Sequence, residues 1–322
     1  MAATSTTESW DAAWTLTMRT HRKRLTDNIF DEYPTLAWLR KAGKVEVENG
    51  GKEIREDLMY GKNSAEWFEG YDTLNTNAVD GITAAFYPWR YIAVPITISL
   101  TEETESQAAD SAKKLLVAKT EQSMSTIRDS INAALFSAQS GKSILGLQDL
   151  VAATSTNSVG GISRSAETWW ANQSQSIGDF DASSSPSYTG LKNWGTLFNN
   201  CSSGNIKPNA NIMPLTFYGQ YESILEGTGY ARVEQNKATG VGTGGNLKFR
   251  GSDVWYDRDC GAALMYCLNS NYLKLKIQKG LNFAKTPFKE PHNQLAKVCF
   301  VVVGCQFVTN NSRRLGVGHT LS

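Results

Sequence analysis

The chain has 322 residues, of which 41% are hydrophobic, 10% aromatic and 20% charged. Its 32 lysines and arginines nearly balance 31 aspartates and glutamates, so it lacks the basic excess of a dedicated nucleic-acid-binding protein. No apolar run approaches the ~20 residues of a membrane-spanning helix. We therefore expect a soluble protein without a membrane partner, with roughly two domains or one domain with a large excursion.

Residues 1–43 are predicted to form an arm rather than a domain. Their polar start lacks the basic stretch and apolar block of a secretory signal, so we expect folding in a cytosol. The sequence RTHRKR at residues 19–24 is the strongest local basic cluster. It could face nucleic acid, an acidic neighbouring subunit or solvent. A short helix is predicted over 27–41, interrupted at Pro34 and ended by Gly43.

Residues 44–95 have a strand pattern. Val45 and Val47 alternate with charged residues, and the sequence NGG at 49–51 predicts a turn. Two strand-like segments then enclose a polar segment that reaches Gly81, which predicts a long hairpin with few core residues at its tip. An isolated hairpin buries too little surface to be stable, so we expect this one to lie against another chain.

Residues 101–139 contain neither glycine nor proline and are predicted to form one helix about 60 Å long at ~1.5 Å per residue. Ser99 or Thr101 is placed to cap its start, and Gly141 to stop it. One helical face carries the apolar residues Ala108, Ala112, Leu115, Leu116, Met124, Ile127, Ile131, Ala134, Leu135 and Ala138. A helix this long predicts an elongated subunit built around a spine.

The remainder of the chain alternates between helix and strand patterns. Residues 144–190 are rich in loops, with Trp169 and Trp170 as an anchor, and residues 191–230 alternate as in an α/β lobe. Strands are predicted at 247–249 and 253–256 and within 264–277. The final apolar segment, KVCFVVVGCQFVTN, is predicted to supply a buried pair of strands.

The motifs that would indicate an enzyme fail on inspection. The sequence SGKS at 140–143 lacks the glycine that a Walker A loop requires at position 136. The sequence GVGTGG at 240–245 precedes a strand-like run where a dinucleotide fold needs a helix, so we expect a loop there. The three histidines, His21, His292 and His319, have no metal-ligand spacing. The sequence therefore predicts no catalytic, cofactor-binding or metal-binding residue.

Carboxylates gather in two places. The first group, at the start of the predicted spine, is Glu102, Glu103 and Glu105, and we interpret it as complementing the helix dipole. The second group is Asp253, Asp257 and Asp259, which a hydrolase or transferase would use if the chain were an enzyme. The cysteines, which match no zinc framework and are expected to be reduced and buried, are Cys201, Cys260, Cys267, Cys299 and Cys305.

The order of these parts resembles the major capsid proteins of tailed bacteriophages, which have the Hong Kong 97-type fold. The resemblance covers nearly the whole chain. It rests on GITAAFYPWRYIAVPITIS before the spine, ILGLQDLVAATSTNSVGGISRSAETWW after it, SDVWYDRDCGAALMYCLNSNYLKL, and the closing RRLG. The second phrase is the most specific. The resemblance implies an α+β fold with an N-arm, an extended E-loop hairpin, a long spine helix, and peripheral and axial domains.

The resemblance also implies a division of the chain and a function. The parts are 1–43 as the N-arm, 44–93 as the E-loop, 94–145 as the peripheral domain with the spine at about 101–139, 146–285 as the axial domain, and 286–322 as C-terminal strands returning to the peripheral domain. The implied function is a non-enzymatic major capsid protein, without cofactors, whose hexamers and pentamers form an icosahedral head around double-stranded DNA. The implied partners are further copies, a separate scaffolding protein, a portal and a decoration protein, in a virion assembled in the bacterial cytoplasm.

Two alternatives stay open at this point. An encapsulin-type compartment shares the fold but encloses protein cargo, and a carboxylate-based hydrolase would remain a small oligomer. Lys52 and Lys62 lie in the candidate E-loop, but no asparagine and glutamate partners are identifiable, so no covalent cross-link is predicted. The E-loop assignment predicts that deleting residues 61–80 leaves a soluble subunit that does not close shells.

Overall fold

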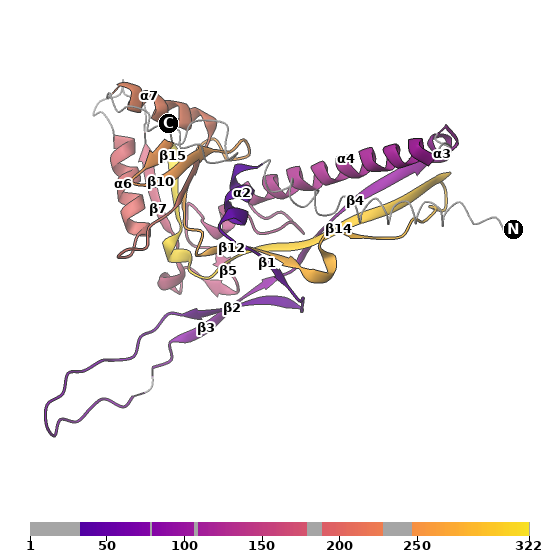
Figure 1. Cartoon of the computed structure of the whole chain (residues 1–322). Coiled ribbons are helices and arrows are strands. Elements are labelled where there is room, and N and C mark those ends of the chain that lie inside the picture. The colour runs from indigo at the N-terminus through magenta and orange to yellow at the C-terminus, as the bar shows by residue number, and fades with distance from the viewer. Residues whose placement is uncertain (1–32, 78, 106–108, 179–188, 228–246, 322) are drawn as a thin grey trace.

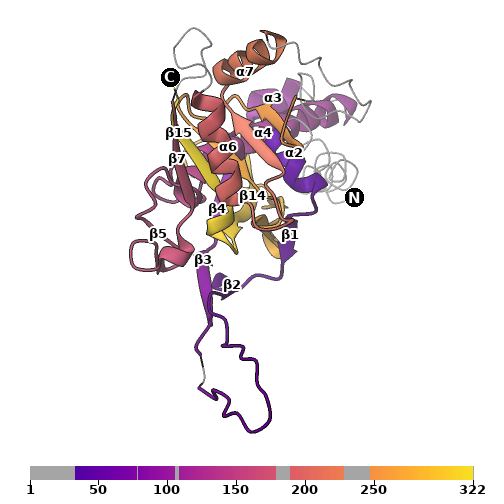
Figure 2. The ribbon, with the colours of Figure 1, turned by 90° about the vertical axis from the view of Figure 1, so that its left-hand side faces the viewer.

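The computed structural model describes residues 33–77, 79–105, 109–178, 189–227 and 247–321. They form two main sheets, a long helix that extends to one side, and a hairpin that projects from the body (Figure 1, Figure 2). The basic cluster at 19–24, the first part of the predicted arm helix and the glycine-rich segment at 240–245 lie outside these residues.

The first sheet is organised by one long strand, β14 (Ala296–Thr309). Strand β4 (Arg90–Ser99) pairs antiparallel with its first ten residues. Strand β12 (Leu273–Gln278) pairs antiparallel with its last five, and β1 (Val45–Glu48) extends the sheet in parallel beyond β12. The short β13 (Ala284–Lys285) pairs with β14 as well. The predicted pair of strands in this segment was therefore wrong, because β14 is continuous and its partners come from distant parts of the chain.

A glycine in the middle of β14 serves close packing rather than a turn. A Cβ atom on Gly304 would lie 3.1 Å from the ring of Tyr91, which faces it from β4. Glycine therefore lets the two strands stay paired where the tyrosine ring crosses them.

The predicted spine corresponds to α3 (Leu100–Glu105) and α4 (Ala109–Phe136). The 28 residues of α4 span about 42 Å at ~1.5 Å per residue and lie along β4 (Figure 1). Most of the predicted apolar face is confirmed, with Leu116, Met124, Ile127, Ile131 and Leu135 all buried. Leu115 and Ala134 are half-buried, and the prediction was wrong for Ala138, which is exposed beyond the end of the helix.

The spine helix ends at Phe136 rather than at the predicted Gln139. Side chains of the short helix α5 (Leu147–Leu150) form hydrogen bonds with backbone groups at the end of the spine helix. Gln148 Nε2 donates to the Phe136 carbonyl oxygen at 2.9 Å, and Asp149 accepts the backbone N–H of Gln139. These contacts replace the helical hydrogen bonds that a longer helix would make. Gly141, predicted to stop the helix, instead lies in the turn that follows, with φ of 55°.

At the start of the spine, Ser99 is the cap and forms a capping box with Glu102. The Glu102 N–H donates to Ser99 Oγ at 3.2 Å, and the Ser99 N–H donates to Glu102 Oε2 at 3.0 Å. Lys119 Nζ also donates to Glu102 Oε2 at 2.6 Å. The hydrogen bond from Lys119, followed by that from Ser99, lowers the pKa of Glu102. Glu102 therefore has a structural role, while the side chains of Glu103 and Glu105 lie outside the described ones.

The second sheet has six strands and carries two helices. Its strands, in spatial order, are β7 (Gln173–Gly178), β15 (Gly316–Leu321), β11 (Met265–Leu268), β8 (Ala210–Met213), β10 (Ser252–Tyr256) and β9 (Leu247–Phe249). Helix α6 (Thr189–Cys201) packs against β7 and β15, and α7 (Leu215–Gly227) against β10 (Figure 2). The ring of Trp194 stacks on Phe249 inside this unit. The mixed arrangement agrees with the predicted α/β lobe.

Strand membership differs from the expected chain segments in two places. The segment 286–322 was expected to return as a whole to the spine's sheet, and β14 does, but β15 lies in the second sheet. Conversely, β12 lies within the expected axial segment but pairs with β14 in the first sheet. The chain passes between the sheets at η3 (Ser312–Arg314), a short 3-10 helix.

The remaining elements surround these sheets. Helix α2 (Pro34–Lys41) ends before Gly43, whose φ is 68°, as predicted. The hairpin consists of β2 (Glu53–Met59) and β3 (Ile82–Pro88). Along the chain, a small pair of strands, β5 (Ser158–Val159) and β6 (Ile162–Ser163), and the 3-10 helix η1 (Thr168–Trp170) come between the spine and β7. A second 3-10 helix, η2 (Lys279–Leu281), follows β12.

All five cysteines are buried and free, as predicted. Burial raises the pKa of Cys267 and of Cys305 to about 12. We therefore expect no reaction with a thiol reagent such as DTNB in the native protein at pH 8, and five equivalents after denaturation. Because the unfolded thiols ionise at a lower pH, their burial should also make stability fall as the pH rises above about 9. Rapid labelling of the native protein would contradict this burial.

Candidate assembly surface

The base of the projecting hairpin is firmly attached to the body. Strands β2 and β3 are in register from Glu53 opposite Pro88 to Met59 opposite Ile82. Their inner faces are buried, and the hydroxyl of Tyr87 donates to the Thr309 carbonyl oxygen at 2.9 Å. The Phe86 N–H donates to the Gly160 carbonyl oxygen at 3.0 Å. The hairpin therefore leaves the body in a fixed direction.

Gln306, a fully buried residue of β14, joins the end of the hairpin to two other segments. Its Nε2 donates to the Pro88 carbonyl oxygen at 2.9 Å, and its Oε1 accepts the Leu145 N–H at 2.9 Å. A buried amide with its hydrogen-bonding groups paired in this way holds the strand junction more specifically than apolar contacts do.

A cluster of charged residues also connects the hairpin base to the first sheet. Glu56 of β2 and Lys276 of β12 are both buried, with Lys276 Nζ 2.8 Å from Glu56 Oε1. Lys276 lies 3.4 Å from both Glu46 and Glu48, while Lys274 lies 3.4 Å from Glu46 and 3.8 Å from Glu56. Burial by itself lowers the pKa of Lys276, but the hydrogen bond and charge of Glu56 and the charges of Glu48 and Glu46 outweigh it and raise that pKa overall. This cluster was not predicted from the sequence, although Glu56 shares the inward face of β2 with Ile54 and Leu58.

The hairpin tip, defined here as residues 61–80, contrasts with this base. It runs away from the body as an open loop (Figure 1, Figure 2). Trp67 and Tyr71 are fully exposed, and two thirds of Phe68 is exposed. The exposed apolar residues continue on both sides with Met59, Leu74, Val79 and Ile82. Exposed aromatic residues gathered on one projection indicate an interaction surface. From the sequence this segment was predicted to be a polar tip, and its aromatic residues were missed.

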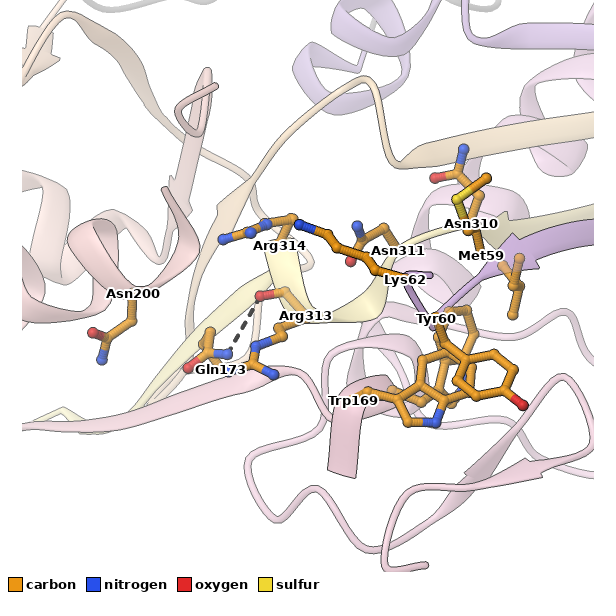
Figure 3. Close-up of a pocket in the computed structure, with 12 residues that line it drawn as sticks. Met59, Tyr60, Lys62, Trp169, Gln173, Asn200, Asn310, Asn311, Arg313 and Arg314 are labelled. Carbon is orange, nitrogen blue, oxygen red and sulfur yellow. Dashed lines mark hydrogen bonds between the residues drawn. The ribbon is translucent and has the colours of Figure 1, made fainter. Parts of the chain in front are cut away.

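A cavity of about 600 Å³ lies where the hairpin meets the body (Figure 3). We call it the basal cavity; it is lined by Leu58, Met59, Tyr60, Lys62, Trp169, Trp170, Gln173, Asn200, Asn310, Asn311, Arg313 and Arg314. The ring of Tyr60 stacks on Trp169, with their centroids 4.9 Å apart. Trp170 is buried and donates from Nε1 to the Val159 carbonyl oxygen at 3.0 Å, as its predicted role as an anchor requires.

The three aspartates of the enzyme alternative do not form a catalytic group. Asp257 is buried and accepts hydrogen bonds from Thr35 Oγ1 at 2.9 Å and from Asn132 Nδ2 at 3.1 Å. Asp259 accepts from the same Asn132 Nδ2 at 2.7 Å. Asp253 is exposed and faces Lys248 at 3.7 Å. Asp257 and Asp259 thus join α2, the spine and the loop after β10, which is a structural role.

Of the other candidate motifs, His21 and the glycine-rich segment at 240–245 lie outside the described residues. Within the described part of the chain, no three residues of the histidine, cysteine, aspartate and glutamate types come together to hold a metal. The segment SGKS forms a turn in which the Ser143 N–H donates to the Ser140 carbonyl oxygen at 3.0 Å. No helix among the described residues is both long and apolar enough to cross a membrane.

Comparison with known proteins gives no match by sequence: no protein-family model and no curated protein matches the chain. Solved structures do match. The capsid asymmetric unit of cyanophage A-1(L) is 14% identical, with a TM-score of 0.66 over 87% of this chain and 90% of that one. The capsid of the native GTA particle is 11% identical, with a TM-score of 0.57 over 88% and 90% of the two chains.

A cellular shell is also similar. The SrpI encapsulin of Synechococcus elongatus is 8% identical, with a TM-score of 0.55 over 88% of each chain. At such identities the likeness concerns the fold alone. It extends over most of each chain and is therefore not the likeness of one short motif.

Proposed function

We propose, from the premise that the chain has the Hong Kong 97-type fold of phage capsid proteins, that it is the major capsid protein of a tailed bacteriophage. Its hexamers and pentamers would form an icosahedral head that encloses double-stranded DNA. The observation that carries this proposal is the exposed aromatic tip on a rigidly held base. Such a projection exposes apolar surface in a single subunit and buries it only against a neighbour.

The parts of the fold take the corresponding roles in this proposal. The hairpin of β2 and β3 is the E-loop, and the spine with the sheet of β14 is the peripheral domain. The sheet that carries α6 and α7 is the axial domain. The pairings of β12 and β15 support assigning β12 to the peripheral domain and β15 to the axial domain, rather than cutting the chain at 285. Residues 1–43 are the N-arm.

The expected partners follow from the same proposal. They are further copies of the chain, a separate scaffolding protein, a portal and a decoration protein, with assembly in the bacterial cytoplasm and residence in the virion. Contacts with the packaged DNA would be independent of its sequence, because packaging must accept any sequence and a formal net charge of +1 provides no strong basic field. No enzymatic activity is proposed, because the carboxylates that would support one have structural partners.

Electron microscopy of the purified chain, expressed alone and with its neighbouring genes, tests this proposal. We expect closed polyhedral shells, or rings of five and six subunits. A uniform monomer or dimer in both preparations would contradict the proposal. The contents of closed shells then separate the two branches of the fold: nuclease-protected DNA supports the phage capsid, whereas a co-purifying protein cargo supports an encapsulin.

A further inference from the structure

We infer that the basal cavity of one subunit binds the acidic, aromatic hairpin tip of a second copy of the chain. The inference rests on the proposed self-assembly and specifies which two surfaces meet. The cavity and the tip have opposite charge, both contain aromatic rings, and the charged side chains of neither form an ion pair among the described residues.

The basal cavity collects positive charge without counter-charge. Lys62, Arg313 and Arg314 line it, and no aspartate or glutamate does. Lys62 extends toward Arg314, and Arg313 lies beside Gln173 (Figure 3). Arg314 is held in place by a hydrogen bond from Nη1 to the Ser202 carbonyl oxygen at 3.0 Å. Positive groups this close repel one another unless an anion joins them.

The polar lining of the basal cavity is suited to a carboxylate. Its amides are Gln173, Asn200, Asn310 and Asn311. Their Nδ2 and Nε2 groups are hydrogen-bond donors, which a carboxylate can accept. Two arginines supply the charged donors that bind carboxylates with two hydrogen bonds each. The stacked rings of Tyr60 and Trp169 beside them provide an aromatic surface.

The hairpin tip has the complementary composition. Its segment EWFEGYD contains three acidic residues, three aromatic residues and no basic residue. Among the described residues, the Glu66 and Asp72 carboxylates accept backbone N–H groups of the tip itself, from Asn75 at 3.2 Å and from Glu69 at 2.9 Å. No ion pair to the acidic residues of this segment exists within the described chain. Trp67 and Tyr71 point their full surface to solvent.

The hairpin tip does not reach the basal cavity of its own subunit, because the hairpin extends away from the body (Figure 1, Figure 2). Trp67 follows Tyr60, at the cavity, by seven residue steps, which is about 23 Å of extended chain at ~3.3 Å per residue. Contact between two different surfaces of identical subunits is heterologous and repeats from head to tail. Such contacts close into rings when the rotation allows, as the proposed hexamers and pentamers require.

Charge reversal in the full-length chain tests the inference. Arg313→Glu in the cavity and Glu69→Arg in the tip each place like charges together in the proposed contact. Both residues are exposed. Neither the Arg313 guanidinium nor the Glu69 carboxylate has an ion-pair partner among the described residues. We expect each single variant to weaken assembly by about tenfold or more, and the double variant to regain most of it. Lys142→Glu, an exposed charge reversal in the turn after the spine, is the matched control.

The readout is the fraction of subunits in rings or shells by sedimentation velocity and electron microscopy. If the unmodified chain forms no assembly, the proposed function fails first. If it assembles and both single variants match Lys142→Glu, or the double variant regains nothing, only the docking inference is overturned. Shells of normal yield in which Arg313→Glu lowers only the DNA content would overturn it as well, since the cavity would then serve nucleic acid.

Discussion

Replacing residues 62–80 by an Asn-Gly turn is expected to abolish rings and shells and to leave a folded, monomeric subunit. The two strands already approach one another at the point of the cut, since the N–H groups of Tyr60 and Gly61 both donate to the Gly81 carbonyl oxygen, at 2.9 and 3.2 Å. A two-residue Asn-Gly loop suits an antiparallel pair at this distance. The base keeps its buried residues and hydrogen bonds, so only the surface offered to a neighbour is lost.

A control that keeps the loop length separates the aromatic contacts from the reach of the loop. Trp67, Phe68 and Tyr71 changed together to serine remove the largest exposed rings and retain every residue of the backbone path. We expect this variant to assemble far less than the unmodified chain, because aromatic residues supply most of the energy of many interfaces. Sedimentation velocity and circular dichroism measure assembly and folding separately. Normal particles from the shortened chain would remove the hairpin from the assembly surface.

Lys276→Met is expected to destabilise the subunit by about 3–5 kcal/mol, the usual effect of breaking a buried ion pair. The change leaves the buried Glu56 without its 2.8 Å partner, and leaves Glu46 and Glu48 facing it with Lys274 as the only cation of the cluster. Denaturant unfolding of the shortened chain measures this effect free of assembly. The double change Lys276→Met and Glu56→Leu should recover most of the loss, because it removes the uncompensated charge as well.

The pH dependence of the same cluster has a definite sign. The pKa of Lys276 is raised in the folded state above its ordinary 10.5. Its contribution to stability is therefore complete below that ordinary value and is lost only as the pH rises through the higher folded value. Lys276→Met and the unmodified chain should keep a constant difference in stability between pH 7 and 9. If the double variant of Lys276→Met and Glu56→Leu is no more stable than Lys276→Met alone, the loss of stability comes from packing rather than from the unpaired charge of Glu56.

The parts of the fold that could be predicted from sequence are those governed by local periodicity. The three-and-four spacing from Leu116 to Leu135 corresponds to the buried face of the spine. Ser99 followed by Glu102 has the spacing of a capping box, and the box is present. The alternating residues of β2, with a loop up to Gly81, predicted the hairpin.

Features that depend on contacts between distant residues could not be predicted. The end of the spine is set by Gln148 and Asp149, which reach back to it from a separate helix. The continuity of β14 depends on β4, about 200 residues earlier in the chain, as the pairing of Ala296 with Ser99 illustrates. The basal cavity brings Lys62 beside Arg313 and Arg314, and no sequence pattern connects residues so far apart.

The unequal attachment of the hairpin to the body has a mechanical consequence. On one side, β3 continues through the buried Trp89 into β4, which is joined to β14 by ten residue pairs. A pull along the hairpin loads these pairs in shear, so their hydrogen bonds must break together. On the other side, β2 connects through Gly50 and Gly51 to β1, which has only four residue pairs with β12. Under tension we therefore expect β1 to separate from β12 first, while the pairing of β4 with β14 keeps the hairpin attached to the body.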